Sequence, residues 1–180
     1  MGKLFFERYL SLRQELDDQC AGLWKVHKTN MLCKSGCSSC CTAFKVLPVE
    51  FGYIRWQMKE MQMHLKPESN DGMCRFLIDN KCSIYLHRPS ACRYEGFPIV
   101  RLNEELDEYE LSFCHLNFRK VTLKKFNSRN VFLEDDYLKK LLDLNNEFIT
   151  SFTETEYEPG EMVDLNSLIG YYITNRISDH

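Results

Sequence analysis

The chain lacks the features that mark membrane, secreted and nucleic-acid-binding proteins. None of its apolar runs approaches the roughly 20 residues that a transmembrane helix requires. Its first residues, Met1 to Arg8, contain no apolar stretch with a small-residue cleavage site, so no secretory signal is predicted. The net charge of −3 gives no general attraction to nucleic acid, although it leaves a local basic patch open. We therefore expect a cytoplasmic protein with no membrane span and no nucleic acid indicated as a partner.

Sequence motifs of the common enzyme classes are also missing. There is no glycine-rich loop of the kind that binds nucleotides, no H-E-x-x-H motif and no Ser/His/Asp arrangement. No pair of acidic residues has a spacing that suggests acid–base work. Hydrolase chemistry is therefore not supported, and the sequence leaves open whether the protein is an enzyme.

Cysteine, in contrast, is abundant, with nine residues in 180. In a reducing compartment, clustered cysteines bind metal or carry out redox chemistry more often than they form disulfides, which remain the alternative. Cys20 continues the apolar stripe of a predicted helix, so we expect it to be a small buried hydrophobic residue. The other eight cysteines share the middle of the chain and are the predicted metal ligands: Cys33, Cys37, Cys40, Cys41, Cys74, Cys82, Cys92 and Cys114.

The densest part of this set is the run Cys33-Lys-Ser-Gly-Cys37-Ser-Ser-Cys40-Cys41. Thiolates are soft ligands that suit zinc, copper(I) and iron–sulfur centres. Because neighbouring side chains of an extended chain point to opposite sides, one sulfur of the vicinal pair more easily joins a first centre while its neighbour joins a second or stays a free thiol. Eight thiolates can form two Cys₄ zinc sites or ligate up to two cubane clusters, so the number of centres stays open.

Helices are predicted at both ends of the chain. Apolar residues recur at three- and four-residue steps over residues 3–28, which is typical of an amphipathic helix. Residues 131–152 have a second such pattern, and Asp164 is a candidate cap for a last helix, so the C-terminal helices would cover residues 131–176. A further helix is expected from Pro48 to about Leu65.

The cysteine-rich core, residues 30–118, is predicted to contain short strands. A hairpin is expected over residues 74–85, with Asp79-Asn80 as its turn. Pro89 is expected to open a helical turn that carries Cys92, before a second strand pair over residues 98–114.

The length suits a single domain over residues 1–180. We predict that it is mainly α, with a small irregular metal-organised core carrying one or two short β-hairpins. The helices at the two ends would frame this core.

The cysteine run and two later stretches resemble a known family. These stretches are Cys74-Arg-Phe-Leu and Cys82-Ser-Ile-Tyr-Leu-His-Arg-Pro-Ser-Ala-Cys92-Arg, and Cys114 closes the set. Over about residues 30–118, the sequence is similar to the YkgJ-type proteins, described as zinc- or iron-chelating domains with an eight-cysteine, CxxCxxCC-like signature. The resemblance implies that the eight cysteines are ligands. It departs from the short signature at Cys33, which three residues rather than two separate from Cys37.

Two arginines lie beside Cys92. Arg88 and Arg93 are predicted to contact the cofactor, since arginine stabilises negative charge near a thiolate cluster; ordinary salt bridges are the alternative. His115, which follows Cys114, is the best histidine candidate for an alternative ligand. Its role is disfavoured by the eight available cysteines.

Three functions compete on this reading. The first is a cysteine-ligated iron–sulfur protein with a redox or cluster-dependent role and an unknown redox or protein partner. The second is a structural zinc-binding interaction module without catalysis. The third is a thiol redox sensor that uses the vicinal pair Cys40-Cys41. The first is favoured because a cluster accommodates the crowded cysteine run.

Overall fold

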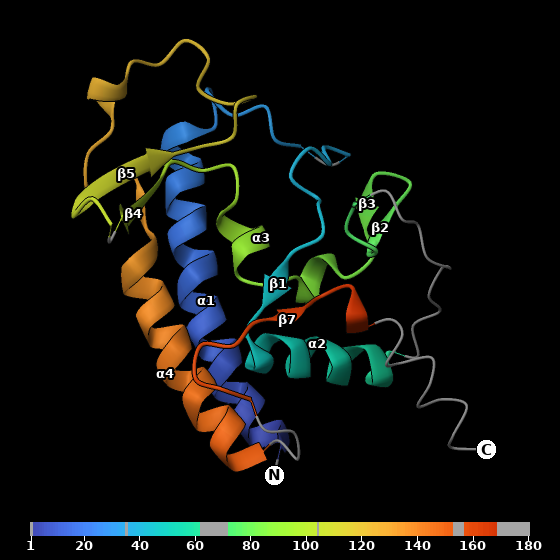
Figure 1. Cartoon of the computed structure of the whole chain (residues 1–180). Coiled ribbons are helices and arrows are strands. Elements are labelled where there is room, and N and C mark those ends of the chain that lie inside the picture. Colours follow the sequence, from blue (N-terminus) through green and yellow to red (C-terminus); the bar gives the residue numbers. More distant parts are fainter. Residues whose placement is uncertain (1, 35, 62–71, 104, 153–156, 169–180) are drawn as a thin grey trace. The chain divides into compact units, whose positions relative to one another are not determined.

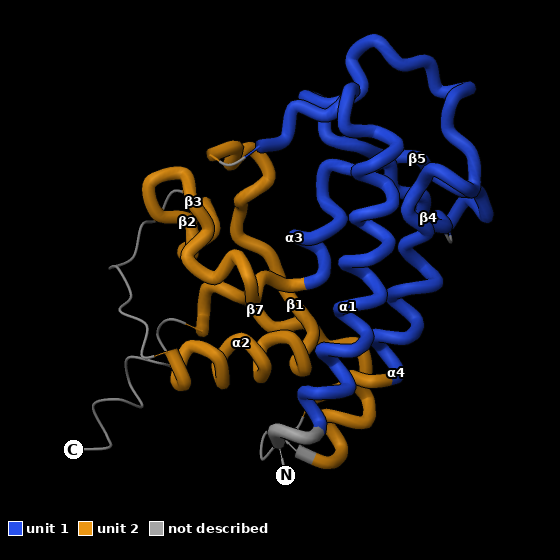
Figure 2. Tube along the Cα trace, turned by 180° about the vertical axis from the view of Figure 1, so that it is seen from behind, with its two compact units in different colours: residues 1, 3–34, 90–143 blue, residues 2, 35–89, 144–180 orange. Residues whose placement is uncertain are grey.

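The computed structural model of the chain describes residues 2–34, 36–61, 72–103, 105–152 and 157–168. It divides into two compact units (Figure 2). Unit 1 contains residues 1, 3–34 and 90–143, and unit 2 contains residues 2, 35–89 and 144–180. Within the described part of the chain, no helix is long and apolar enough to cross a membrane.

Unit 1 is built on helix α1, Gly2–His27, which confirms the helix predicted over residues 3–28. Its apolar stripe is buried, and Tyr9 and Leu16 are completely inaccessible to solvent. Helix α4, Glu134–Phe152, lies beside α1, and an ion pair of 2.7 Å joins Lys140 Nζ of α4 to Glu15 Oε2 of α1 (Figure 1). Residues 134–143 of α4 belong to unit 1 and the rest of the helix to unit 2.

A three-stranded sheet completes unit 1, in the order β5-β4-β6. Strands β4, Ile99–Asn103, and β5, Glu108–Ser112, form the strand pair expected over residues 98–114. The short strand β6, Phe132–Leu133, pairs in parallel with the start of β4. It replaces the first turn of the helix predicted from residue 131, because the Phe132 amide bonds the Pro98 carbonyl at 2.8 Å. Helix α4 therefore begins only at Glu134.

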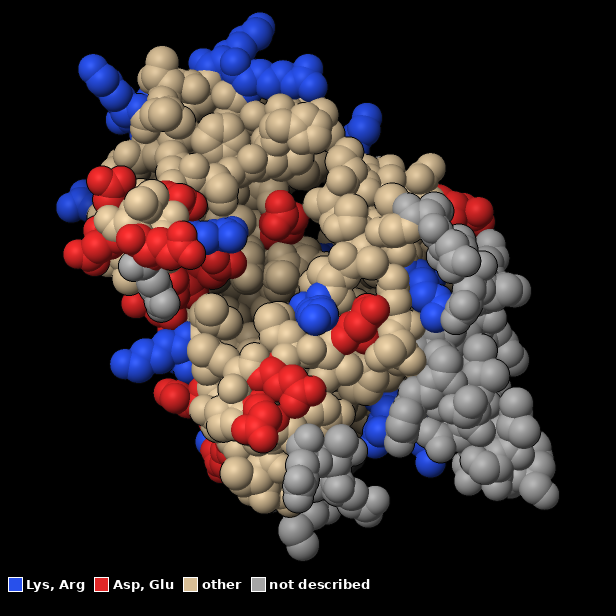
Figure 3. Space-filling view, viewed as in Figure 1, with Lys and Arg blue, Asp and Glu red and all other residues tan. Residues whose placement is uncertain are grey.

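Basic side chains gather at one end of unit 1, at the upper end of the view in Figure 3. Residues 111–133 contain no acidic residue, and their Lys and Arg side chains are all exposed: Arg119, Lys120, Lys124, Lys125 and Arg129. Two of them belong to the 3₁₀ turn η2, Leu123–Lys125. A local positive surface is therefore present although the net charge of the whole chain is −3.

Unit 2 contains helix α2, Pro48–Glu60, which begins at the predicted proline. The Val49 amide in its first turn donates to Asn145 Oδ1 at 3.0 Å, which satisfies one of the amides that a helix start leaves unpaired. The part of the prediction that extends this helix to Leu65 lies outside the described residues. The same is true of the end of the predicted last helix. Its predicted cap, Asp164, is the last residue of a strand, but its Oδ1 accepts the Asn166 amide at 2.9 Å and residues 167–168 are helical.

The strands of unit 2 form two small antiparallel pairs. Strand β1, Lys45–Val46, pairs with β7, Val163–Asp164, although more than a hundred residues separate them in the chain. Strands β2, Leu77–Ile78, and β3, Lys81–Cys82, form the predicted hairpin. Its turn residues Asp79 and Asn80 both have positive φ, 50° and 58°, as a tight two-residue hairpin turn requires.

The prediction of a mainly α fold with short hairpins is confirmed for its helices and hairpins, but it omits strand pairs between distant segments. The long-range β1–β7 pair and the parallel β4–β6 pair make the chain a mixed α/β protein with small sheets. Both pairs join segments that are distant in sequence, and each contains a strand of only two residues. Such strands are too short for an alternating pattern to reveal them.

Two helical glycines give opposite stability predictions. Nothing lies within 4 Å of a Cβ placed on Gly22 of α1, whereas a Cβ on Gly52 of α2 would lie 2.7 Å from Phe148 Cζ. We expect Gly22→Ala to raise the unfolding free energy by about 0.5–1 kcal/mol, because alanine is the better helix former. Gly52→Ala should instead lower it by about 1 kcal/mol, because the buried phenyl ring must move. Denaturant unfolding of the two variants compares them; equal gains would contradict the tight packing at Gly52.

Candidate metal centre

The predicted ligands are divided between the two units. Unit 2 contains five cysteines and unit 1 contains three, besides Cys20. All nine are free thiols. Cys40 is exposed and the others are half-buried, so Cys20 is less buried than the small buried hydrophobic residue that was expected.

In unit 2, a backbone pairing brings Cys41 next to Cys74. The Cys74 amide donates to the Cys41 carbonyl at 3.0 Å, and the Ala43 amide donates to the Gly72 carbonyl at 2.9 Å. Thr42 and Met73, between these bonds, form an isolated antiparallel bridge. Two cysteines that 33 positions separate in the sequence are therefore held side by side by main-chain hydrogen bonds.

The hairpin adds Cys82 to this pair. Cys74 lies just before β2, and Cys82 in β3 stands opposite Leu77 of β2. The loop that carries Cys37 is tied to the hairpin turn, since Ser38 Oγ lies 3.2 Å from Asn80 Oδ1. The loop and the hairpin are thus joined at two places, the Cys41–Cys74 pairing and the Ser38–Asn80 bond.

The thiols of Cys41, Cys74 and Cys82 influence one another electrostatically. Burial is the largest cause that raises the pKa of each of the three thiols above its ordinary value. The pKa of Cys74 is raised further by the charges of Cys82 and Cys41, and the pKa of Cys82 by the charge of Cys41. These three sulfurs are therefore close enough together for like charges to repel.

Hydrogen bonds partly oppose this rise. The Phe76 and Leu77 amides bond the sulfur of Cys74, and the Ile84 amide bonds the sulfur of Cys82; these bonds lower the pKa of each thiol. Amide donors of this kind favour the thiolate, which is the form that binds metal. The short turns after the two cysteines thus offset part of the rise in pKa that burial causes at both sulfurs.

Asn166, which the sequence analysis did not single out, holds the backbone on both sides of Cys74. Its Oδ1 accepts from the Arg75 amide at 3.0 Å, and its Nδ2 donates to the Met73 carbonyl at 3.3 Å. Arg75 returns a bond from its guanidinium to the Asn166 carbonyl at 3.1 Å. No spacing or composition signal marks this residue, because its role depends on the β1–β7 pairing that brings residues 163–168 to this place.

The cysteines of unit 1 have a different environment. The side chain of Asn117 bonds the sulfur of Cys33 at 3.2 Å, and its main-chain amide bonds the Cys114 carbonyl at 2.9 Å. Cys92 lies in the predicted helical turn, which is α3, Ala91–Tyr94. Asn117 was not singled out from the sequence either, since a lone asparagine carries no pattern.

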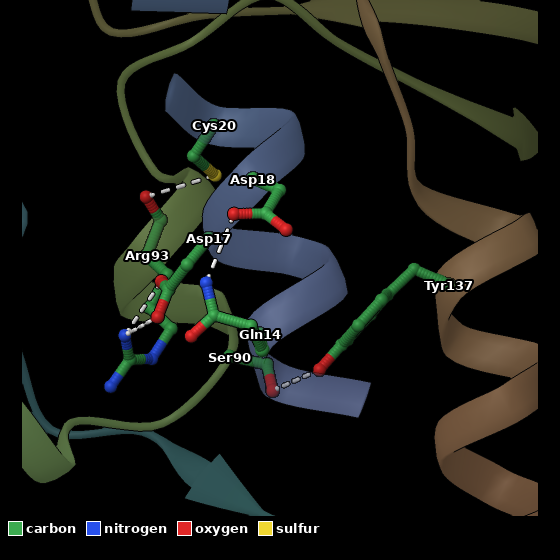
Figure 4. Close-up of polar contacts among 7 residues, drawn as sticks. All are labelled: Gln14, Asp17, Asp18, Cys20, Ser90, Arg93 and Tyr137. Atoms are coloured by element: carbon green, nitrogen blue, oxygen red, sulfur yellow. Dashed lines mark hydrogen bonds and ion pairs between the residues drawn. The ribbon is translucent and has the colours of Figure 1, made fainter. Parts of the chain in front are cut away.

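Of the two predicted cofactor-binding arginines, Arg93 makes a salt bridge. Its Nη1 lies 2.7 and 2.8 Å from the two carboxylate oxygens of Asp17 on α1, and only 6% of its side chain is exposed (Figure 4). Cys20 donates a hydrogen bond to the Arg93 carbonyl at 3.6 Å. The ion pair and this bond join α3, the helix of Cys92, to α1.

Arg88, in contrast, belongs to unit 2 and lies near a thiol. Its guanidinium carbon is 3.8 Å from the ring centroid of Tyr85, and its charge lowers the pKa of Cys82, against the larger effect of burial. A contact of either arginine with a cofactor stays a prediction.

No histidine that the structure describes joins cysteines in a group that could hold a metal ion. His115 is exposed, and His87 is half-buried and bonds the Tyr53 hydroxyl through Nδ1 at 2.9 Å. Across the described segments, no three His, Cys, Asp or Glu side chains form a group that could hold a metal ion. The chemistry of the donors nevertheless fits a soft metal, because the unit 2 set is entirely thiol and two of its sulfurs accept amide hydrogen bonds.

Two ion pairs of α1 should differ in their contribution to stability. Asp17→Asn leaves the buried guanidinium of Arg93 without its carboxylate, so we expect a loss of about 1–3 kcal/mol in unfolding free energy. Lys140→Met breaks the pair with Glu15, whose two side chains are 58% and 51% exposed, and should change stability by less than about 0.5 kcal/mol. Denaturant unfolding at neutral pH measures both; equal effects would show that burial of Arg93 is energetically unimportant.

The raised thiol pKa values predict a loss of stability at alkaline pH. A folded thiol with a raised pKa keeps its proton after the unfolded chain has ionised. The stabilisation it gives is therefore complete below the ordinary thiol pKa of 9.0 and is lost as the pH rises through the folded pKa. We expect the metal-free, reduced protein to lose unfolding free energy above pH 9 more steeply than Cys41→Ser/Cys74→Ser/Cys82→Ser. Parallel pH profiles for the two proteins would contradict the raised pKa values of these thiols.

Comparison with known proteins gives one match. The family model CxxCxxCC, described as "Putative zinc- or iron-chelating domain", matches residues 32–115, close to the expected range of 30–118. No curated protein matches the chain. No solved structure matches it either. The chain therefore contains a CxxCxxCC domain, which spans residues 32–115 and includes all eight cysteines predicted as ligands.

Proposed function

We propose that this protein holds an iron–sulfur cluster through cysteine thiolates and has a redox or cluster-dependent role. The observation that carries the proposal is the group Cys41, Cys74 and Cys82, which a main-chain hydrogen bond and the β2–β3 hairpin bring together and in which two sulfurs accept amide hydrogen bonds. Cys37 or Cys40, which share the neighbouring loop, would supply a fourth ligand.

The electrostatics of this group favour a bound cation. Three neighbouring thiolates repel one another, and partial burial adds to the cost of their charges. A metal centre removes that cost, because it brings positive charge to the sulfurs and displaces their protons. Metal affinity should therefore fall as the pH falls, since protons compete for the same sulfurs.

The protein supplies the means by which a cluster potential is set. Amide hydrogen bonds to the Cys74 and Cys82 sulfurs, the nearby charge of Arg88 and partial burial all act on the ligand atoms. An iron–sulfur cluster bound there would supply one-electron transfer. Zinc bound by the same thiolates would supply folding free energy instead, which is the alternative reading.

A thiol switch is supported by one separate observation. Cys40 is exposed, and its side chain hydrogen-bonds Cys41, which lowers the pKa of Cys41 against the larger effect of burial. An accessible cysteine next to a second cysteine is an arrangement in which an oxidant can convert one sulfur to a sulfenic acid that then condenses with the neighbouring thiol to a disulfide. This role would belong to the same loop in the metal-free protein.

The test is metal analysis of protein purified without oxygen. We expect iron and acid-labile sulfide in matching amounts and broad visible absorption. Cys41→Ser, Cys74→Ser and Cys82→Ser should each remove most of the bound metal, because each deletes a ligand. Cys20→Ser is the matched control and should keep its metal, since Cys20 bonds a backbone carbonyl in unit 1.

Each other outcome points to one alternative. Stoichiometric zinc in a colourless protein would exclude the cluster and favour the structural module. Absence of both metals, together with a reversible oxidation that depends on Cys40 and Cys41, would favour the thiol switch. Metal that survives replacement of all three cysteines by serine would contradict the ligand assignment in unit 2.

A further inference from the structure

A buried asparagine of unit 1 donates a hydrogen bond to the sulfur of a predicted ligand. Asn117 is 1% exposed, and its Nδ2 lies 3.2 Å from Cys33 Sγ. It lies two positions beyond the end of the CxxCxxCC match at residue 115. A buried polar side chain is costly unless each of its groups has a partner, so the partners of this amide define its role.

The partners fix the orientation of the amide. Its Oδ1 accepts from the Leu32 amide at 2.8 Å, and its Nδ2 donates to the Gly96 carbonyl at 2.8 Å. A flipped amide would place a donor against the Leu32 N–H and an acceptor against the Gly96 carbonyl. Since Nδ2 has two hydrogens and Gly96 takes one, the second is left for Cys33 Sγ, which accepts it at 3.2 Å. The protonated Cys33 thiol also lies 3.7 Å from Asn117 Oδ1, to which it can donate, and the thiolate form would keep only the shorter bond from Nδ2.

The backbone around Asn117 is also held on both sides. Its own amide bonds the Cys114 carbonyl, and the next amide, that of Phe118, bonds the Asn30 carbonyl, both at 2.9 Å. The ring of Phe118 is buried and packs edge-on against His27 of α1, with centroids 5.2 Å apart. The side-chain amide is thus set in place before any ligand arrives.

The sulfur of Cys33 fits closely against Gly96. A Cβ at Gly96 would lie 3.0 Å from Cys33 Sγ and 3.4 Å from Asn117 Nδ2, and the φ of +99° is one that glycine adopts readily. No larger residue fits there without displacing the sulfur or its donor. The glycine therefore allows the close approach of Cys33 to the amide.

We infer that Asn117 is a positioning residue for Cys33, which it orients and stabilises as a thiolate ligand through the Nδ2–H···Sγ hydrogen bond. The inference rests on the proposed function, because it concerns Cys33 as a metal ligand. Cys33 is the predicted ligand at which the sequence departs from the family spacing. The hydrogen bond from Asn117 supports its assignment as a metal ligand by an observation that does not depend on that spacing. A donor to a ligating sulfur is a partner whose loss typically weakens metal binding about 10- to 100-fold.

The test is a double-mutant cycle with Co²⁺ as the probe. The metal-free, reduced, full-length protein is titrated with Co²⁺ without oxygen, and the thiolate-to-cobalt absorption band gives affinity and thiolate count. Asn117→Asp keeps the shape of the side chain but faces the sulfur with an acceptor. We expect it to weaken binding about 10- to 100-fold and to reduce the band. Cys33→Ser should do the same, and the double variant should be little worse than Cys33→Ser alone.

The controls separate positioning from folding. Asn145→Asp changes a second fully buried asparagine, which bonds the Val49 amide and no sulfur, and should leave Co²⁺ affinity within about twofold of wild type. If Asn117→Asp does not fold, Asn117→Ser, too short to reach the sulfur, replaces it. Gly96→Ala, which displaces the sulfur, should reduce the band as Cys33→Ser does.

Two results would count against the inference, and they are distinguishable. Wild-type affinity and band in Asn117→Asp, or an undiminished effect of that change in the Cys33→Ser background, would overturn the role of Asn117 while the proposed function stands. A wild-type protein that shows no thiolate-to-cobalt band would overturn the proposed function, and the inference with it.

Discussion

Burial of closely placed thiols is the constraint on which the cysteine-rich part of unit 2 depends. Burial raises the pKa of Cys41, Cys74 and Cys82, and the charge of a neighbouring cysteine raises each pKa further, so the sulfurs repel one another once they ionise. Such a group is stable only with protons or a cation on the sulfurs. The pairing of residues 41–43 with residues 72–74 and the tight hairpin turn hold the thiols together against this repulsion.

Support for the cysteines comes from residues outside the matched domain. Asn166 bonds the backbone before and after Cys74, and Asn117 bonds the sulfur of Cys33 and the amide before it. Both use the same property of asparagine, which offers a donor and an acceptor at once. The segment after residue 115 therefore helps to fix the backbone at Cys74 and the sulfur of Cys33, two of the predicted ligands.

Arg93 is next to the predicted ligand Cys92 in the sequence, but its side chain has a structural partner, Asp17. Its guanidinium is buried and paired with Asp17, and its carbonyl accepts the Cys20 thiol, so the ninth cysteine has a hydrogen-bonding role on α1. Fixing α3 against α1 also fixes the helix on which Cys92 lies. Arg88 instead stacks on Tyr85 and acts on Cys82 through its charge.

The sequence by itself determined the features whose causes are local. The stripe of α1, the proline that starts α2 and the Asp79-Asn80 turn each depend on neighbouring residues, and each was predicted correctly. The CxxCxxCC domain was also predicted correctly, because its cysteine spacing can be read directly from the sequence. The two-residue strands, the division of the cysteines between the units and the roles of Asn117 and Asn166 could not be predicted. Only the tertiary structure decided these features, because each requires contact between segments that are distant in the chain. A two-residue strand or a lone asparagine has no periodicity or spacing that would reveal its partner from the sequence alone.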